Sequence, residues 1–238
     1  MTSDRLAPDI DFPEGYIINV DKPLGWTSTD VVRKIKFMLG KLGHRRIKVG
    51  HAGTLDPLAT GVLIVCIGRA TKMVDALQAE TKVYETDIRL GATTPSYDLE
   101  HEVDTLYPWE HITAESLREA LDGLCGERLQ TPPIYSAKQI DGRRAYEYAR
   151  EGSEVKMKQA LVNIHSMEIL SCQLPCVRLR ITCSKGTYIR SIAKELGEAL
   201  GSGAHLTSLR RIASGGFTVA HALTMEEIVA ALSPGAEA

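Results

Sequence analysis

Long apolar runs are missing from this sequence: no stretch approaches the roughly 20 residues that a membrane-spanning helix requires. The first nine residues hold neither a basic segment nor an apolar core, which excludes a secretory signal. The five cysteines are odd in number, and Cys172 and Cys176 have no Cys or His partners at zinc-site spacing. We therefore expect no membrane contact, no metal, and reduced, packed thiols in a cytoplasmic protein.

A strong net charge is also missing, since the whole chain carries only −2. The charges are unevenly distributed, however. Residues 33–48 contain seven Lys or Arg and no acid, whereas residues 98–127 contain nine acids and one base. This asymmetry is typical of a protein with a basic face for phosphates and an acidic face turned away from them. The alternative is that each run is simply a solvated helix surface.

Apolar periodicity predicts the secondary structure. We expect strands at 16–20, 62–67, 83–90, 162–170 and 177–183, and helices at about 30–42, 70–79, 112–124, 143–150 and 188–200. Segment 206–212 fits a short strand or a helix. Ser28 or Thr29 can cap the first helix, and Thr113 can cap the third. Strands interspersed with helices predict an α+β fold, with a mixed, mostly antiparallel sheet flanked by helices and loops.

The length of 238 residues fits one large domain or two small subdomains that share a core. We expect residues 1–13 to form a flexible N-terminal tail, because they carry no strand or helix pattern. Residues 14–238 would then form the functional domain. Within it, residues 130–152 read as an insertion that is rich in basic residues and tyrosines, which suits either RNA contact or an ordinary surface hairpin.

Asp56 lies in the loop at residues 50–61, which contains three glycines, one proline and this single carboxylate. Pro57 biases Asp56 toward an extended backbone and removes one N–H that could have bonded the carboxylate. The glycines allow close approach by a ligand. Since the loop runs into the apolar stretch 62–67, the pattern indicates a catalytic carboxylate at the edge of a buried strand. A structural aspartate in a tight turn is the alternative.

Five segments together carry a resemblance to a known family. They are 21–28 (DKPLGWTS), 50–61 (GHAGTLDPLATG), 82–84 (KVY), 184–191 (SKGTYIRS) and 203–211 (GAHLTSLRR). In this order and spacing the chain resembles the TruB family of tRNA pseudouridine-55 synthases, from about Gly15 to Phe217. The resemblance implies the pseudouridine synthase fold and an isomerase. Such an enzyme breaks the N1–C1′ bond of one T-loop uridine, turns the flipped-out uracil and rejoins it through C5, without metal or cofactor.

The resemblance also assigns catalytic roles. Asp56 matches the essential aspartate, which acts at C1′ as nucleophile or as a stabiliser of cationic character. Arg190 matches the arginine that pairs with this aspartate. Tyr84 matches the tyrosine that stacks on the target base, and Tyr188 the tyrosine that lines the other side of the site and is a candidate for moving a proton. Each tyrosine, taken alone, would fit core packing better than a role in the site.

Further residues match the family's RNA-binding and supporting positions. His51 matches the histidine that fills the space left by the flipped nucleotide, and Leu209 the leucine that closes the base pocket. Lys22 and Pro23 match a motif that we interpret as bracing the catalytic loop. The insertion at 130–152 matches the segment that clamps the T-arm. The basic residues expected to contact RNA are Arg45, Arg46, Lys138, Arg143 and Arg144.

Two departures from the family pattern stand out. Many members of the family continue into a C-terminal PUA domain, which we expect to be missing here because only about 20 residues follow the last match. In segment 94–98, Asp98 is kept while an earlier aspartate is lost. The expected partner is the tRNA T-arm stem-loop, bound by a monomer without an obligatory protein partner. The alternatives are a non-catalytic RNA-binding protein, a nucleoside hydrolase, and an enzyme that works within a guide-RNA particle.

Overall fold

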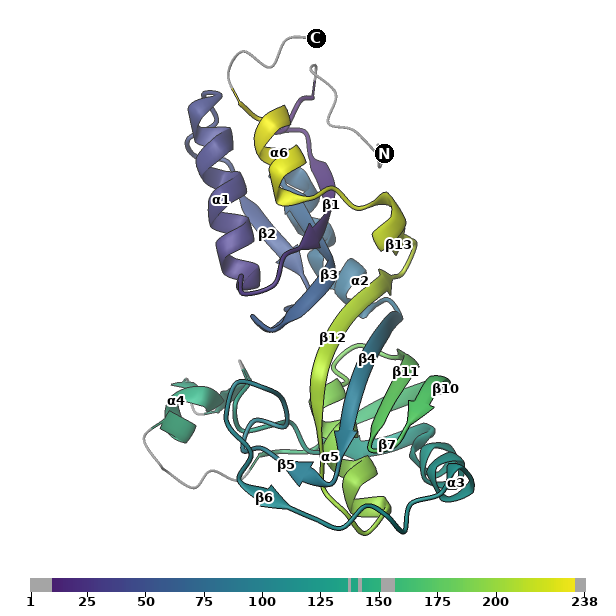
Figure 1. The fold of residues 1–238 in the computed structure, drawn as a ribbon. Helices are drawn as coiled ribbons and strands as arrows, with labels where there is room; N and C mark the ends of the chain where they lie inside the picture. Colours follow the sequence, from purple (N-terminus) through teal and green to yellow (C-terminus); the bar gives the residue numbers. More distant parts are fainter. Residues whose placement is uncertain (1–9, 137, 141–142, 151–156, 234–238) are drawn as a thin grey trace. The chain divides into compact units, whose positions relative to one another are not determined.

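The computed structural model describes residues 10–233, apart from 137, 141–142 and 151–156. The chain divides into two compact units: residues 1–84 with 210–238 form the first, and residues 85–209 form the second. Two strands carry the chain from one unit to the other, β4 (Lys82–Leu90) and β12 (Ala204–Ser214) (Figure 1). Over the described ranges, no helix has both the length and the apolar character to span a membrane.

The first unit is built around β3 (Ala59–Ile67), whose side chains are buried on both faces of the sheet. Strands β1 (Tyr16–Lys22) and β2 (Val49–Ala52) both pair antiparallel with β3. In the β1–β3 register Lys22 lies opposite Gly61, so the C-terminal end of β1 meets the start of β3. The short β13 (Phe217–Thr218) pairs antiparallel with the end of β12.

Helices cover both faces of these strands. Helix α2 (Val74–Ala79) follows the 3₁₀ helix η1 (Gly68–Met73), and α1 (Ser28–Lys41) lies beside α6 (Met225–Ala231), which follows η2 (Val219–His221) (Figure 1). One face of β3 packs with α2 in a core formed by Ala52, Val62, Ile64, Cys66 and Ala70, with Val74 and Leu77 against it. The apolar stripe of α1 is buried as well: Val31, Ile35, Met38 and Leu39.

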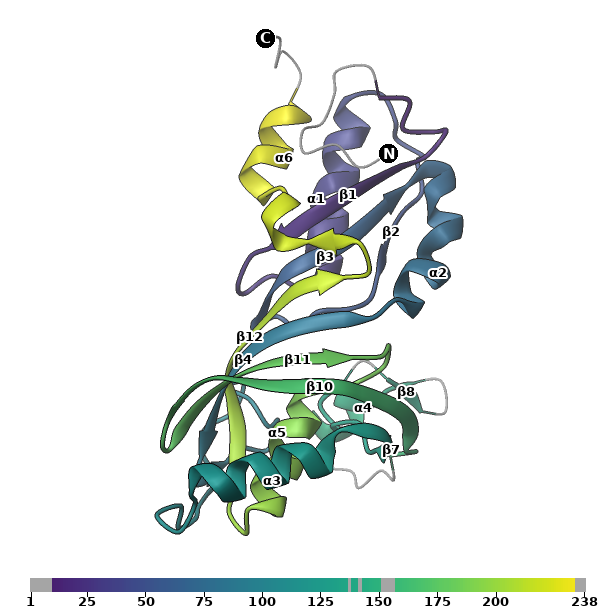
Figure 2. The same ribbon diagram turned by 90° about the vertical axis from the view of Figure 1, so that its right-hand side faces the viewer.

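The second unit contains a sheet with the strand order β12-β4-β11-β10-β7. Strands β10 (Ala160–Gln173) and β11 (Cys176–Cys183) form an antiparallel hairpin, and β7 (Gly126–Gln130) pairs antiparallel with β10. Helices α3 (Ala114–Leu124) and α5 (Ile189–Ala199) pack against each other, and α3 also contacts β10 (Figure 2). Two short ladders complete the unit, β5–β6 (Ala92–Thr93, Thr105–Leu106) and β8–β9 (Gln139–Ile140, Arg143–Arg144).

The predicted α+β class and the mostly antiparallel sheet are confirmed. Thr113 caps α3 as expected, but the cap predicted for α1 was wrong. The cap is Thr27: its hydroxyl accepts from the Asp30 N–H, and the Asp30 carboxylate accepts from the Thr27 N–H in a capping box. Segment 206–212 belongs to a strand. Helix α4 (Ala145–Arg150) begins two residues later than predicted, because Arg143 and Arg144 are part of the β8–β9 ladder.

Two further expectations need correction. Residues 1–9 of the predicted tail lie outside the described residues, but Phe12 is buried and its ring makes edge contacts with Tyr16 and His44. Phe12, which lies within the predicted tail, therefore packs on the first unit. Cys66 and Cys183 are buried thiols, whereas Cys172 and Cys176 are exposed because they lie at the turn end of the β10–β11 hairpin.

Candidate functional site

The two residues that flank Asp56 are both fixed to the segment that follows β1. On one side, the buried Ser28 Oγ donates to the Leu55 carbonyl oxygen at 3.1 Å and accepts from the Leu55 N–H at 2.8 Å. This single hydroxyl therefore satisfies both backbone groups of a buried residue. Ser28 starts α1, so the helix and the loop are held together at one point.

On the other side of Asp56, the Pro57 carbonyl oxygen accepts from the Gly25 N–H at 2.9 Å and from Lys22 Nζ at 3.5 Å. Lys22 is fully buried and also donates to the carbonyl oxygens of Pro23 at 2.9 Å and Trp26 at 2.6 Å. Burial lowers the pKa of Lys22 from 10.5 to about 8, an effect that the nearby Asp56 carboxylate partly opposes. The lysine ammonium thus joins the two loops by three carbonyl contacts.

A second buried cation, Arg211, holds the opposite side of the loop. Its Nε donates to the Val62 carbonyl oxygen at 2.7 Å and its guanidinium to the Gly53 carbonyl oxygen at 3.1 Å. The guanidinium also lies 3.5 Å from the Tyr84 hydroxyl. The backbone of Arg211 comes so close to Gly61 (φ +97°) that a Cβ there would lie 2.2 Å from the Arg211 carbonyl oxygen, so only glycine fits.

His51 and Tyr84 lie on the strands next to this loop. His51, in β2, is partly buried, and burial together with the positive charge of Arg211 lowers its pKa below 6.5. The imidazole is therefore neutral near pH 7. Its Nδ1 is buried and has no hydrogen-bond partner among the described residues. Tyr84, in β4, is 8% exposed, so most of its ring is packed.

In the second unit, the start of α5 is held by an amide clamp. The Gln130 side chain accepts from the Tyr188 N–H at 2.8 Å and donates to the Tyr188 carbonyl oxygen at 3.2 Å. Ser191 Oγ donates to the Thr131 carbonyl oxygen at 2.8 Å. Tyr188 is the N-cap residue of α5, so the end of β7 fixes the backbone from which this tyrosine projects.

Arg190 is the second residue of α5. Its side chain is buried and lies against segment 94–98. Its Nε is 3.6 Å from the Asp98 carboxylate, and its guanidinium donates to the Ser96 carbonyl oxygen at 3.3 Å. The Asp98 carboxylate also accepts from the Glu100 N–H at 3.0 Å. Asp98, which sequence analysis left without a role, thus anchors Arg190 within this unit. The expected pairing of Arg190 with Asp56 stays a prediction.

The other predicted site residues are spread over both units. Leu209 is half-buried on β12. In the insertion, Lys138 Nζ donates to the Lys158 carbonyl oxygen at 2.7 Å, and Arg143 lies 4.7 Å from the centre of the Tyr148 ring. The Arg144 side chain lies outside the described residues. Arg45 and Arg46 are exposed and line a pocket at the far end of α1.

Sequence analysis missed three residues that hold this arrangement, Ser28, Arg211 and Gln130. Ser28 and Arg211 lie inside the motifs quoted above, so proximity to the motifs could have indicated them. Their partners, however, lie 27 to 158 positions away along the chain. Gln130 gave no signal, because its partner Tyr188 is 58 positions away.

Comparison with known proteins identifies the class. Residues 40–189 match the model of the TruB family pseudouridylate synthase N-terminal domain, and residues 190–237 match the tRNA pseudouridylate synthase B C-terminal domain. The tRNA pseudouridine synthase B of Parabacteroides distasonis is 52% identical over 220 residues, which cover 92% of this chain and 94% of that protein. That of Chlorobaculum tepidum is 48% identical over 217 residues, covering 91% and 90%.

Solved structures give the same fold. The chain is similar to a protein in a Cbf5-Nop10-Gar1 complex, with 29% identity and a TM-score of 0.71, over 96% of this chain and 58% of that one. It is also similar to a chain of an H/ACA RNP bound to a substrate RNA, with 28% identity and a TM-score of 0.65, over 94% and 59%. The fold is thus that of the pseudouridine synthases. Within that class, the chain belongs to the TruB family.

Replacement of Ser28 by alanine tests the anchor at Leu55. We expect Ser28→Ala to lower the free energy of unfolding by about 1–3 kcal/mol, because it leaves the buried N–H and C=O of Leu55 without their partner. Urea denaturation measures this loss. The adjacent Thr29→Ala is the matched control: Thr29 is exposed, and its side chain has no partner among the described residues, so a change within about 0.5 kcal/mol is expected. Equal losses in the two variants would contradict the anchoring role.

The lowered pKa of Lys22 predicts a pH dependence of stability. Between about pH 8 and 10.5 the unfolded chain holds the Lys22 proton and the folded chain has released it, so the free energy of unfolding rises with pH. Across this window the Lys22 contribution amounts to about 3 kcal/mol. We expect the free energy of unfolding of the wild type to rise, relative to that of Lys22→Met, between pH 7 and pH 10. If the difference in unfolding free energy between the two proteins does not change with pH, burial does not lower the pKa of Lys22.

Proposed function

We propose that this chain converts uridine to pseudouridine at position 55 in the T-loop of tRNA, with Asp56 as the catalytic carboxylate. The observation that carries the proposal is the fixation of Asp56: its two neighbours are anchored by Ser28, Gly25 and Lys22, and the loop is held from the other side by Arg211. Family membership and the names of the relatives support the reaction and the substrate.

The reaction is an isomerisation without added atoms. The N1–C1′ bond breaks with Asp56 as nucleophile at C1′ or as a stabiliser of the positive charge there. The uracil turns, and a C5–C1′ bond forms as Asp56 leaves C1′ in the nucleophilic route. C5 loses its proton while N1 gains one. A rigid loop favours this step because the carboxylate is already positioned and needs little reorganisation. Tyr188 is the proposed carrier of the proton.

The remaining residues of the site are proposed to bind the flipped nucleotide and the RNA around it. Tyr84 would stack on the target base, Tyr188 would line the opposite side, and Leu209 would close the pocket. His51 would fill the space that the base leaves in the RNA. A neutral imidazole suits that position, because it can stack among bases without carrying a charge.

We further propose that residues 130–152, as an insertion in the catalytic domain, clamp the T-arm. Arg143 lies over the Tyr148 ring and pairs with Glu147 at 3.6 Å, and this grouping of basic and aromatic side chains supports RNA contact. The enzyme would act in the cytoplasm as a monomer on tRNA alone. A guide-RNA particle is the competing arrangement, since one similar solved structure is of an H/ACA RNP bound to a substrate RNA. Turnover with protein and tRNA as the only macromolecules would separate the two.

The central test is the product of an unmodified tRNA transcript incubated with the protein and no cofactor. We expect one pseudouridine in the T-loop, and we expect Asp56→Asn to reduce its rate at least about 100-fold because the carboxylate charge is lost. The matched control is Asp75→Asn, an exposed carboxylate of α2, which should form product normally. Retained turnover in Asp56→Asn would refute the catalytic role. Tight tRNA binding without product in the wild type would favour a binding protein, and release of free uracil a hydrolase.

Arg190 is proposed to orient Asp56 and to be oriented itself by Asp98. Arg190→Lys keeps the charge and loses the planar fork, so we expect kcat to fall more than about tenfold while tRNA affinity changes less than about threefold. The companion Asp98→Asn removes the ion pair but keeps the guanidinium, and a smaller loss of kcat is expected. If both variants lost stability and kcat equally, Arg190 would be a structural residue only. Thermal unfolding and single-turnover kinetics supply both readouts.

A further inference from the structure

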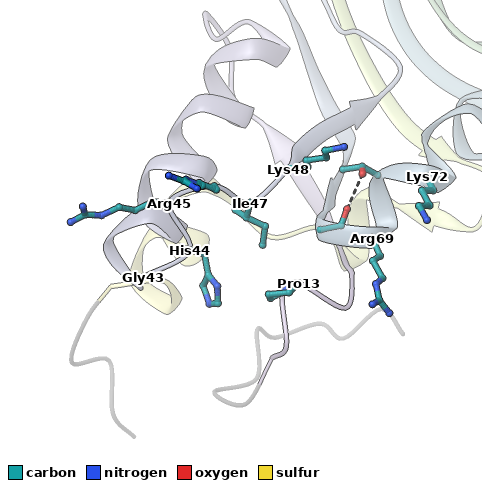
Figure 3. Close-up of a pocket in the computed structure, with 11 residues that line it drawn as sticks. Pro13, Gly43, His44, Arg45, Ile47, Lys48, Arg69 and Lys72 are labelled. Atoms are coloured by element: carbon teal, nitrogen blue, oxygen red, sulfur yellow. Dashed lines mark hydrogen bonds between the residues drawn. The ribbon is translucent and has the colours of Figure 1, made fainter.

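A pocket of about 660 Å³ lies in the first unit (Figure 3), and none of its lining residues belongs to the Asp56 loop. Two segments far apart in sequence line it: residues 43–48 after α1, and residues 68–72 of η1, with Pro13 beside them. Ser28, which touches Leu55, begins α1, whereas this pocket follows its end. Since α1 has 14 residues, the two sites are separated by about 21 Å of helix.

The pocket lining is strongly basic. It contains five Lys or Arg and one histidine, and none of the lining residues is acidic: Pro13, Gly43, His44, Arg45, Arg46, Ile47, Lys48, Gly68, Arg69, Thr71 and Lys72. Arg69 pairs with Glu14 at 2.6 Å on an exposed surface. Within the described residues, the side chains of Arg45, Arg46, Lys48 and Lys72 have no partner, so their charges are available to a ligand.

The arrangement of these charges indicates the kind of anion. Figure 3 shows Arg45 and Arg69 pointing away from each other, while Ile47 and Pro13 form apolar surface between them. Cations that gripped a single phosphate would converge on one point, whereas these are spread over both walls. Such a spread matches consecutive phosphates of a polynucleotide, with apolar contact for a sugar between them.

We propose that this pocket binds phosphate groups of the RNA backbone, at a second contact separate from the catalytic loop. The proposal rests on the proposed function, since it takes the RNA to be the tRNA substrate. RNA that reaches both sites would be held at two points roughly one α1 length apart. The pocket then contributes affinity and register but no chemistry.

The salt dependence of tRNA binding tests the proposal, because each phosphate contact adds to the slope of log Kd against log salt. We choose Arg46→Gln/Lys72→Gln, which removes one charge from each lining segment. The control Arg89→Gln/Arg118→Gln removes two charges from exposed side chains in the second unit that have no partner among the described residues. All four side chains are exposed, so thermal unfolding should be unchanged in both variants.

We expect filter binding with full-length tRNA between about 50 and 200 mM salt to show a slope reduced by about 1.8 in the pocket variant and unchanged in the control. Equal slopes in the two variants would overturn the proposal. Binding of inorganic phosphate that the pocket variant abolishes, without any change in the RNA slope, would make this a small-phosphate site and also overturn it. The assay needs no turnover. If the wild type forms no pseudouridine but the pocket variant still shows the reduced slope, the proposed reaction is refuted and the proposed RNA contact is supported.

Discussion

The anchoring of the peptides on both sides of Asp56 is the constraint on which the first unit depends. A loop with three glycines has high conformational freedom in the unfolded chain, and a carboxylate on such a loop would otherwise sample many positions. Ser28 fixes the residue before Asp56, and Gly25 and Lys22 fix the residue after it. The backbone on both sides of Asp56 is therefore held in place.

Buried cations provide much of this rigidity. Lys22 and Arg211 are both removed from solvent, and both direct their donors at carbonyl oxygens of the loop region. Burial of a charge is costly unless hydrogen bonds compensate it, so each cation demands a particular arrangement of carbonyl groups. The two cations therefore require one conformation of the loop, and that conformation determines where the lysine and the arginine lie. Neutral residues at these positions would fill the space without setting the direction of the carbonyl groups.

Local features of the fold could be predicted from the sequence, and long-range ones could not. The apolar run of β3, the alternation of β4 and the Thr113 cap depend on neighbours within a few positions, and each is confirmed. The prediction that Ser28 or Thr29 caps α1 failed because the position of the cap depends on a distant partner. Ser28 is drawn inward to Leu55, which leaves the capping box to Thr27 and Asp30. No local pattern contains that contact.

The same limit applies to the candidate site. The motifs were sufficient to select Asp56, Lys22 and Arg190. They did not indicate the contacts that Arg211 and Asp98 make. Asp98 lies 92 positions from Arg190, and only the packing of segment 94–98 against α5 reveals the pair. Residue types alone also misjudged Phe12, whose burial depends on contacts with Tyr16 and His44 rather than on its flanking sequence.

The basic side chains thus divide into two classes with different physical behaviour. Lys22, Arg211 and Arg190 are buried and bonded to the protein, so salt screens their interactions weakly. The cations of the pocket at the far end of α1 are exposed, and salt competes with any anion that they bind. Geometry at Asp56 should therefore persist across ionic strengths at which RNA affinity changes greatly. In the proposed function, this separation would let a protein of nearly neutral net charge combine a rigid loop at Asp56 with salt-sensitive binding of RNA.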